Sequence, residues 1–116
     1  MLDIMLQDRI RLASLLDKVM SPAEAALLIR DGMTVGMSGF TRAGDAKAVP
    51  LSLAERAATE PFGITLITGA SLGNGIDEVL TRSHVLKRRL PFQSDRVLRN
   101  ALNKGEVMFI DQHLSE

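Results

Sequence analysis

The sequence has 116 residues, which is enough for one domain with a single hydrophobic core. Charged residues make up 24% of it, with 14 basic and 14 acidic side chains, so neither nucleic acid nor an anionic membrane is expected as a partner. The sequence contains no cysteine, which excludes disulfides, thiolate metal sites and cysteine nucleophiles. The opening residues lack a signal-peptide pattern and no apolar stretch has membrane-spanning length, so a cytoplasmic location is expected.

Residues 1–20 are expected to form an N-terminal helical arm. Their apolar residues recur at three- and four-residue steps, which predicts an amphipathic helix over residues 4–17. The sequence SPAE at residues 21–24 has the pattern of a capping box with proline at the first helical position, so a second helix is predicted from residue 22 to about residue 30. Gly32 is expected to end that helix in the left-handed conformation.

The rest of the chain alternates strands with helices. Pro91 keeps the stretch before it extended, and Ser94 is expected to cap the last helix. Strands separated by helix-length crossovers predict the α/β class, a parallel sheet with helices on both faces. The last strand has nothing to cover its far side, so we expect an incomplete domain. Buried strands are predicted over residues 33–39, 64–68 and 107–111, and helices over about 48–59, 76–82 and 95–103.

Two glycine-rich stretches, the first bend (residues 36–44) and the second bend (residues 69–75), follow predicted strands. Ligands of open α/β sheets bind beyond the carboxyl ends of the strands, so we expect the two bends to lie side by side and shape half of an anion-accepting cleft. The glycine spacing of the first bend matches neither a dinucleotide fingerprint nor a P-loop. Nucleotide hydrolysis is therefore not expected.

Lys47 lies at the start of a predicted helix, where a cation opposes the helix dipole and an anionic ligand would offset the cost. The spacing leaves open the alternative that the glycines only permit tight turns and Lys47 extends into water. The basic run at residues 87–89 is interpreted as a solvated edge rather than a phosphate site. His84 and His113 have no partner at ligand spacing, so no metal is assigned.

Five stretches carry a resemblance to a known family. In their order and spacing they resemble the beginning of the acetyl-CoA hydrolase/transferase family, in particular its succinyl-CoA:acetate CoA-transferase branch. The similarity extends from residue 8 to residue 116 but covers only about the first quarter of such an enzyme. The five stretches are DRIRLASLLDKVMSPAEAALLIRDG, VGMSGFTRAGDAKAVP, ITLITGAS, RLPFQSD and GEVMFIDQHLSE.

The resemblance implies a CoA-transferase-like N-terminal domain of a two-domain, homodimeric enzyme of acetate metabolism, which moves coenzyme A between small carboxylic acids through a glutamyl thioester. Acyl-CoA and a carboxylate are then the substrates, and no cofactor is bound covalently. The nucleophilic glutamate is expected in the remainder of the parent polypeptide, so this chain has no catalytic residue and alone is expected to be inactive. Two alternatives stay open: thioester hydrolysis by the same family, and a non-catalytic α/β assembly fragment.

The resemblance also places part of the carboxylate-side pocket in this chain. Ser71 and Ser94 match hydroxyl positions that line the family's active site, although Ser71 could equally cap the helix at residues 76–82 and Ser94 its own helix. The expected substrate-binding residues of the two bends and their surroundings are Gly39, Phe40, Thr41, Gly44, Lys47, Gly69, Ala70, Ser71 and Ser94.

Overall fold

The computed structural model describes residues 4–111. His113 and the other residues of the C-terminal end lie outside this range. None of the described helices has the length and apolar character that a membrane-spanning helix needs. In chain order the elements are α1 (Ile4–Arg9), the 3-10 helix η1 (Ala13–Lys18), α2 (Pro22–Leu27), β1 (Thr34–Gly36), α3 (Ala48–Ala57), β2 (Ile64–Ile67), α4 (Ile76–Arg82), β3 (Leu86–Leu90), α5 (Arg96–Asn103) and β4 (Met108–Phe109).

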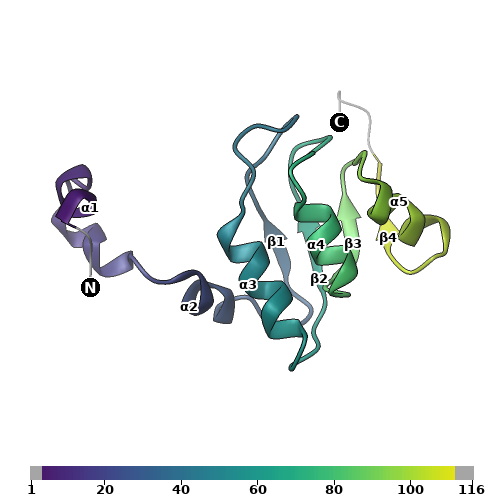
Figure 1. Ribbon diagram of the computed structural model, residues 1–116, viewed down its shortest axis with the longest axis horizontal. Helices are drawn as coiled ribbons and strands as arrows, with labels where there is room; N and C mark the ends of the chain where they lie inside the picture. Colours follow the sequence, from purple (N-terminus) through teal and green to yellow (C-terminus); the bar gives the residue numbers. More distant parts are fainter. Residues whose placement is uncertain (1–3, 112–116) are drawn as a thin grey trace.

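The strands form one parallel sheet in the order β1-β2-β3-β4, so each strand lies beside the next one along the chain (Figure 1). The register places Val35 of β1 beside Leu66 of β2, and Leu66 beside Arg89 of β3. The predicted α/β class and parallel pairing are confirmed, but β1 and β4 are shorter than predicted and are largely exposed rather than buried. β3 was not among the predicted strands, because its LKRRL sequence lacks the β-branched apolar pattern of a buried strand.

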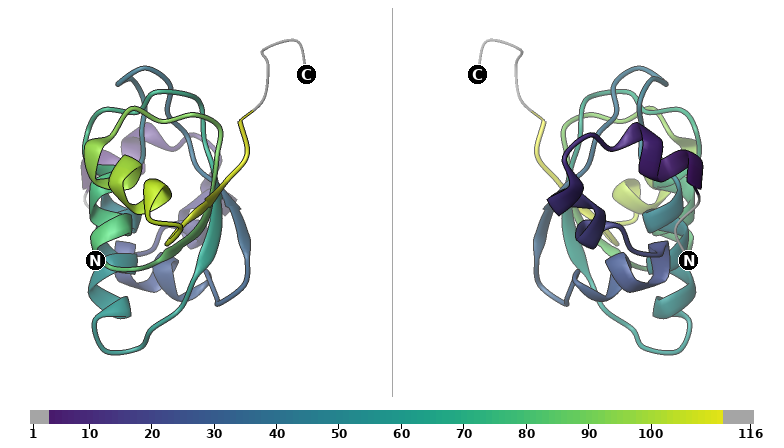
Figure 2. Two further views of the ribbon diagram at one scale, coloured as in Figure 1. Left: turned by 90° about the vertical axis from the view of Figure 1, so that its right-hand side faces the viewer. Right: turned by 90° about the vertical axis from the view of Figure 1, so that its left-hand side faces the viewer.

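The helices α3, α4 and α5 all lie on one face of the sheet (Figure 2). Leu66 of β2 and Leu86 of β3 point into the core on that side and are buried. On the same strands Ile67 and Arg88 are exposed, as is Met108 of β4. Residues 4–111 thus supply α3, α4 and α5 to one sheet face, and the predicted helices on the second face are not found among them. The buried apolar core consists of Ala26, Leu53, Ala57, Phe62, Ile64, Leu66, Leu72, Ile76, Leu80, Val85, Leu86, Leu98, Ala101 and Val107.

The start of α2 confirms the predicted capping box. Ser21 Oγ accepts a hydrogen bond from the Glu24 amide at 3.1 Å, and Glu24 Oε2 accepts one from the Ser21 amide at 2.8 Å. The helix ends at Leu27, earlier than predicted, so Gly32 has the predicted left-handed conformation (φ 81°) but does not cap the helix. The Arg56 side chain of α3 donates to the carbonyls of Ala26 (2.5 Å) and Ile29 (2.6 Å) and so holds this end of α2 against α3.

The prediction of one amphipathic helix over residues 4–17 is wrong. α1 ends at Arg9, and the next helical segment, the 3-10 helix η1, begins only at Ala13. Leu12 is 60% exposed and Leu15 48% exposed, so these two side chains find little packing surface among the described residues, although Ile10 and Leu16 are half-buried. An apolar stripe stabilises a helix mainly when it is buried, and isolated short helices are marginal in water. Figure 1 shows this arm projecting from the body of the protein.

Candidate functional site

The two glycine bends lie side by side at the carboxyl ends of β1 and β2, as predicted. The Gly69 amide donates a hydrogen bond to the Gly39 carbonyl at 2.8 Å, and the Thr41 amide donates to the Ala70 carbonyl at 3.0 Å. The contact is tight, because a Cβ atom at position 69 would lie 2.2 Å from the Gly39 oxygen. Only glycine at position 69 allows the bends to approach this closely.

The first bend closes through a two-residue turn. Phe40 and Ala43 exchange two backbone hydrogen bonds of 3.0 Å, which puts Thr41 (φ 47°) and Arg42 (φ 66°) at the tip in the left-handed region. For a β-branched residue such as Thr41 this conformation is strained. Ser38 Oγ donates to the Gly44 carbonyl at 2.6 Å and draws the two ends of the bend together. The bend is thus a fixed structure that holds the Thr41 amide against the second bend.

A third loop, residues 91–95 after β3, completes the row of loops. The Ser71 amide donates to the Phe92 carbonyl at 3.2 Å, which joins the second bend to this loop. Ser71 also has a positive φ of 56°. Ser94 is exposed in the third loop, so Thr41, Ser71 and Ser94 lie on three adjacent loops at one edge of the sheet.

Neither serine caps a helix, contrary to two of the sequence interpretations. Asp95 is the N-cap of α5, and its Oδ1 accepts from the Leu98 amide at 2.8 Å. The N-cap of α4 is Gly75, with φ 92° and no side-chain cap. A carboxylate next to Ser94 takes the cap because it also stabilises the positive helix end. The hydroxyls of Ser71 and Ser94 are therefore not occupied by capping.

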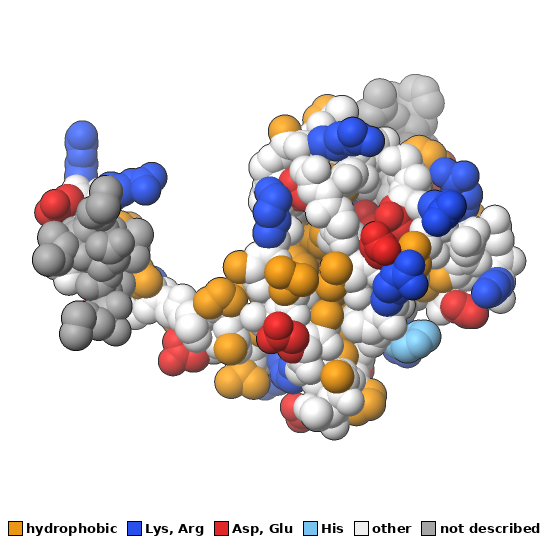
Figure 3. Space-filling model, viewed as in Figure 1, with side chains coloured by type: hydrophobic (Ala, Val, Ile, Leu, Met, Phe, Trp, Pro, Cys, Tyr) orange, Lys and Arg blue, Asp and Glu red, His pale blue; other side chains and the backbone are white. Residues whose placement is uncertain are grey.

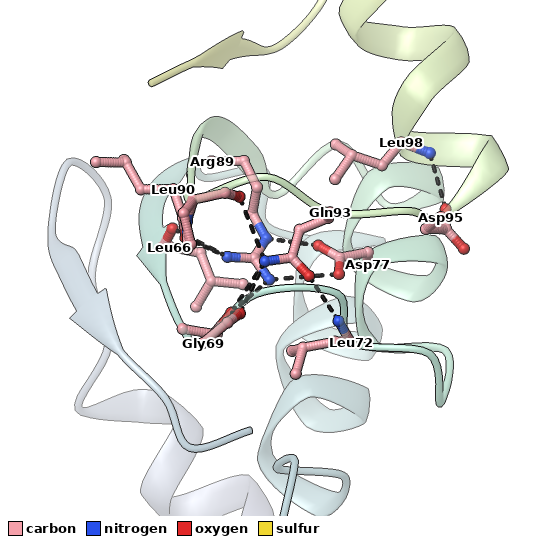
Figure 4. A network of polar contacts seen from close by, with 11 residues as sticks. Leu66, Gly69, Leu72, Asp77, Arg89, Leu90, Gln93, Asp95 and Leu98 are labelled. Carbon is pink, nitrogen blue, oxygen red and sulfur yellow. Dashed lines mark hydrogen bonds and ion pairs between the residues drawn. The ribbon is translucent and has the colours of Figure 1, made fainter. Parts of the chain in front are cut away.

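A buried ion pair holds the start of the second bend in place (Figure 4). Arg89 of β3 and Asp77 of α4 have side chains only 1% and 2% exposed, with Arg89 Nε 2.5 Å from Asp77 Oδ1. The same guanidinium donates to the Leu90 carbonyl at 2.6 Å and to Thr68 Oγ1 at 2.7 Å, directly before the second bend. Burial raises the pKa of Asp77, while Arg89 opposes this rise. The ion pair fixes α4, β3 and the start of the second bend to one another.

Gln93 ties the third loop to the second bend at two points. Its Oε1 accepts from the Leu72 amide at 2.8 Å, and its Nε2 donates to the Gly69 carbonyl at 2.9 Å (Figure 4). The sequence interpretation missed this side chain and also treated Arg89 as part of a solvated basic run. That interpretation holds for Lys87 and Arg88, which are exposed, but is wrong for Arg89. Asp77, the buried partner of Arg89, lies twelve residues away from it in the sequence, so no local sequence pattern could predict the pair.

Lys47 lies at the rim of a hollow between the ends of the first and second bends. The hollow has a volume of about 190 Å³ and is lined by Lys47, by Asn74 and Gly75 of the second bend, and by apolar side chains of α3 and α4. Lys47 Nζ lies 3.6 Å from Asp45 Oδ1, so an internal carboxylate already offsets the cation at the start of α3. Asp45 Oδ2 is buried without a hydrogen-bond partner among the described residues.

Asp45 also connects the two bends. Asn74 Nδ2 donates to Asp45 Oδ1 at 2.9 Å and to the Arg42 carbonyl at 3.0 Å. The Asn74 amide, followed by smaller effects that include Lys47, holds the pKa of Asp45 below its ordinary value. The ionised carboxylate is therefore the form that the folded protein favours.

This depressed pKa gives a pH-dependent prediction for Asn74→Ala. The contribution of Asp45 to stability is present above its unfolded pKa and is lost as the pH falls through the lowered folded pKa. Urea unfolding should therefore show a deficit for Asn74→Ala at pH 7 that shrinks as the pH is lowered below 4. Asn100→Ala, which changes an exposed amide on α5, is the control and should show no such trend. A pH-independent deficit for Asn74→Ala would contradict the assignment.

The sequence profile of the acetyl-CoA hydrolase/transferase N-terminal domain matches residues 5–116. Among curated relatives, a protein named succinyl-CoA:acetate CoA-transferase from Clostridium kluyveri is 39% identical over 94% of this chain. A propanoyl-CoA:succinate CoA transferase from Escherichia coli is 42% identical over 84% of it, and an acetyl-CoA hydrolase from Kluyveromyces lactis is 36% identical over 96%. The chain spans only 21–22% of the length of these relatives.

Proposed function

This chain belongs to the acetyl-CoA hydrolase/transferase family, and on that premise we propose that it forms part of an enzyme that moves coenzyme A between small carboxylic acids. Its proposed contribution is the carboxylate side of the active site, built from Gly39, Phe40, Thr41, Gly44, Lys47, Gly69, Ala70, Ser71 and Ser94. The observation that carries this proposal is the pair of hydrogen bonds that hold the two glycine bends against each other at the carboxyl edge of the sheet.

The geometry of the bends supports recognition of a small acid. Thr41, Ser71 and Ser94 present three hydroxyls on adjacent loops, and hydroxyl groups can orient a carboxylate by donating hydrogen bonds. Thr41 and Ser71 both occupy strained backbone conformations, which are often retained where function requires them. The neighbouring hollow of about 190 Å³ has the ammonium group of Lys47 at its rim and suits a small anion.

The proposed chemistry requires a glutamate that residues 4–111 do not place at the bends. Glu24 is held in the capping box of α2, and Glu78 pairs with Arg82 at 3.0 Å. Glu55 and Glu60 are exposed on α3 and just after its end. We therefore place the nucleophile in the part of the enzyme that this chain does not contain.

In the proposed reaction, that glutamate attacks the acyl-CoA carbonyl and expels the CoA thiolate, giving a mixed anhydride. The thiolate then attacks the glutamyl carbonyl, which releases the first acid and leaves a glutamyl-CoA thioester. A second carboxylate, oriented by the bends, attacks this thioester, and the sequence of steps runs in reverse to give the new acyl-CoA. No water is consumed, and the glutamate is regenerated.

The relatives named acetyl-CoA hydrolase support a second outcome at the same site, in which water cleaves the thioester. The two reactions differ in their products. The longer enzyme that contains this chain, incubated with succinyl-CoA and acetate, should form acetyl-CoA and succinate in equal amounts. Free coenzyme A that accumulates equally with and without acetate would instead assign hydrolysis. Formation of neither product with acetate, propionate or succinate as acceptor would contradict the proposal.

A substitution of Lys47 tests whether its ammonium group contributes to the site. Lys47→Ala in the longer enzyme should lower kcat/KM for the acid about tenfold, since a charge-assisted contact contributes roughly 1.5–3 kcal/mol. Its effect on stability should be small, because the Lys47 side chain is 67% exposed and its bridge to Asp45 lies near the surface. Lys18→Ala, an exposed lysine of the N-terminal arm, is the matched control. An unchanged kcat/KM for Lys47→Ala would show that the Lys47 ammonium group does not contact the acid.

A further inference from the structure

We propose that the groove between α4 and α5 binds a phosphate-bearing small molecule, at a site separate from the glycine bends. The groove has a volume of about 560 Å³. Volumes of this size are typical of sites for small organic ligands and exceed the space that a single ion needs. The side chains that would recognise the ligand are Thr81, Arg82, His84, Arg96, Asn100 and Lys104.

The charge of the groove is the first argument for an anionic ligand. The whole chain carries equal numbers of acidic and basic residues, but the groove is lined by three cations and one acid, Glu106. Arg82 is engaged by Glu78 at 3.0 Å. Within residues 4–111, neither Arg96 nor Lys104 has a carboxylate within 4.0 Å. Figure 3 shows Lys, Arg and His side chains over α4 and α5, with Asp and Glu side chains among them.

A buried hydroxyl is the second, independent argument. Thr81 lines the groove and is only 8% exposed, and its Oγ1 has no hydrogen-bond partner among the described residues. A buried hydroxyl without a partner is unfavourable, so such groups are rare in folded proteins. A ligand oxygen at the floor of the groove would accept this hydrogen bond. The cations around it favour phosphate oxygens, which accept several charge-assisted hydrogen bonds at once.

The position of the groove separates it from the proposed transfer site. His84 lies just before β3, at the amino end of the strand, whereas the third loop follows the carboxyl end. The groove is walled by α4 and α5, and none of the residues expected to bind the carboxylate substrate lines it. Binding here therefore goes beyond the proposed transfer reaction and can be measured without it.

Binding can be followed by NMR on ¹⁵N-labelled protein titrated with inorganic pyrophosphate, with ADP and with uncharged adenosine. Pyrophosphate and ADP should cause saturable shifts of the amides at residues 81–84 and 96–104, and adenosine should cause none. Tighter binding of ADP than of pyrophosphate would identify a nucleotide as the ligand, and equal binding would identify the phosphate group alone. Absence of saturable shifts, or shifts spread over the whole protein, would overturn the proposal.

Charge variants separate a built site from general electrostatic attraction. Arg96→Ala combined with Lys104→Ala should weaken pyrophosphate binding about tenfold or more, because each removes a charge-assisted contact. Arg11→Ala combined with Lys18→Ala removes the same charge from the N-terminal arm and should leave binding unchanged. Equal weakening by the two double variants would overturn the proposal.

Thr81→Val provides a test with opposite signs for stability and binding. Valine keeps the shape of threonine but removes the hydroxyl, so the variant should unfold at a higher temperature than the wild type. Its affinity for pyrophosphate should nevertheless fall, because the ligand loses a hydrogen-bond donor. Unchanged affinity in the stabilised variant would show that the Thr81 hydroxyl does not face the ligand and would contradict the site.

Discussion

Replacing Asp77 by alanine is expected to lower the free energy of unfolding by about 3–5 kcal/mol, because it leaves Arg89 charged and unpaired inside the protein. The Arg89 side chain is 1% exposed, and a guanidinium does not lose its proton in the folded state. Domains of this size are stable by only about 5–15 kcal/mol, so the variant should be close to unfolded at 37 °C. Urea denaturation measures the loss directly.

Two further variants show whether the ion pair causes this loss. Glu78→Ala breaks the neighbouring pair with Arg82, whose side chains are 65% and 46% exposed, and should cost less than about 1 kcal/mol. Asp77→Leu combined with Arg89→Met removes both charges and should recover part of the stability, because no unpaired charge remains. Recovery is incomplete because the Leu90 carbonyl and Thr68 lose a donor. If Asp77→Ala costs no more than Glu78→Ala, the buried pair does not anchor the loops.

Gly69→Ala is expected to separate the two bends. The new methyl group would lie 2.2 Å from the Gly39 carbonyl oxygen and about 3 Å from the Phe40 side chain, so backbone has to move. Overpacking of this kind typically costs about 1–3 kcal/mol. A displacement of about 1 Å in a substrate-positioning loop can lower the rate by about a hundredfold. The longer enzyme should therefore lose CoA transfer activity far more than stability.

Gly36→Ala is the matched control for this substitution. Gly36 is the last residue of β1 and the first residue of the first bend, and nothing lies within 4 Å of a Cβ atom added there. Its unfolding free energy and transfer rate should remain close to those of the wild type. Equal rates for Gly69→Ala and Gly36→Ala would mean that the close approach of the bends has no part in the reaction.

Local signals predicted the parts of the fold that depend on nearby residues. The capping box at Ser21 and Glu24 is confirmed, and helices α3 and α4 begin at the predicted residues, 48 and 76. The adjacency of the bends was also predictable, because the carboxyl ends of neighbouring parallel strands meet at one edge of a sheet. These features follow from spacing of a few residues or from a general rule of topology.

The features that the sequence did not reveal depend on long-range contacts. Strand β3 contains Arg89, whose burial is possible only because Asp77 arrives from α4. Gln93 holds the second bend through partners more than twenty residues away. The N-terminal arm shows the reverse case, since Leu12 and Leu15 have helical spacing but no described surface on which to pack. Periodicity alone therefore overestimated that helix.

The most direct test of the bends as a carboxylate site is a crystal structure of the longer enzyme with acetate or succinate bound. The carboxylate should lie within about 2.7–3.2 Å of an amide of the first bend or of the Ser71 hydroxyl. The Gly69 amide should still donate its hydrogen bond to the Gly39 carbonyl. An acid bound away from both bends, or bends that lie apart in the crystal, would contradict the proposed site.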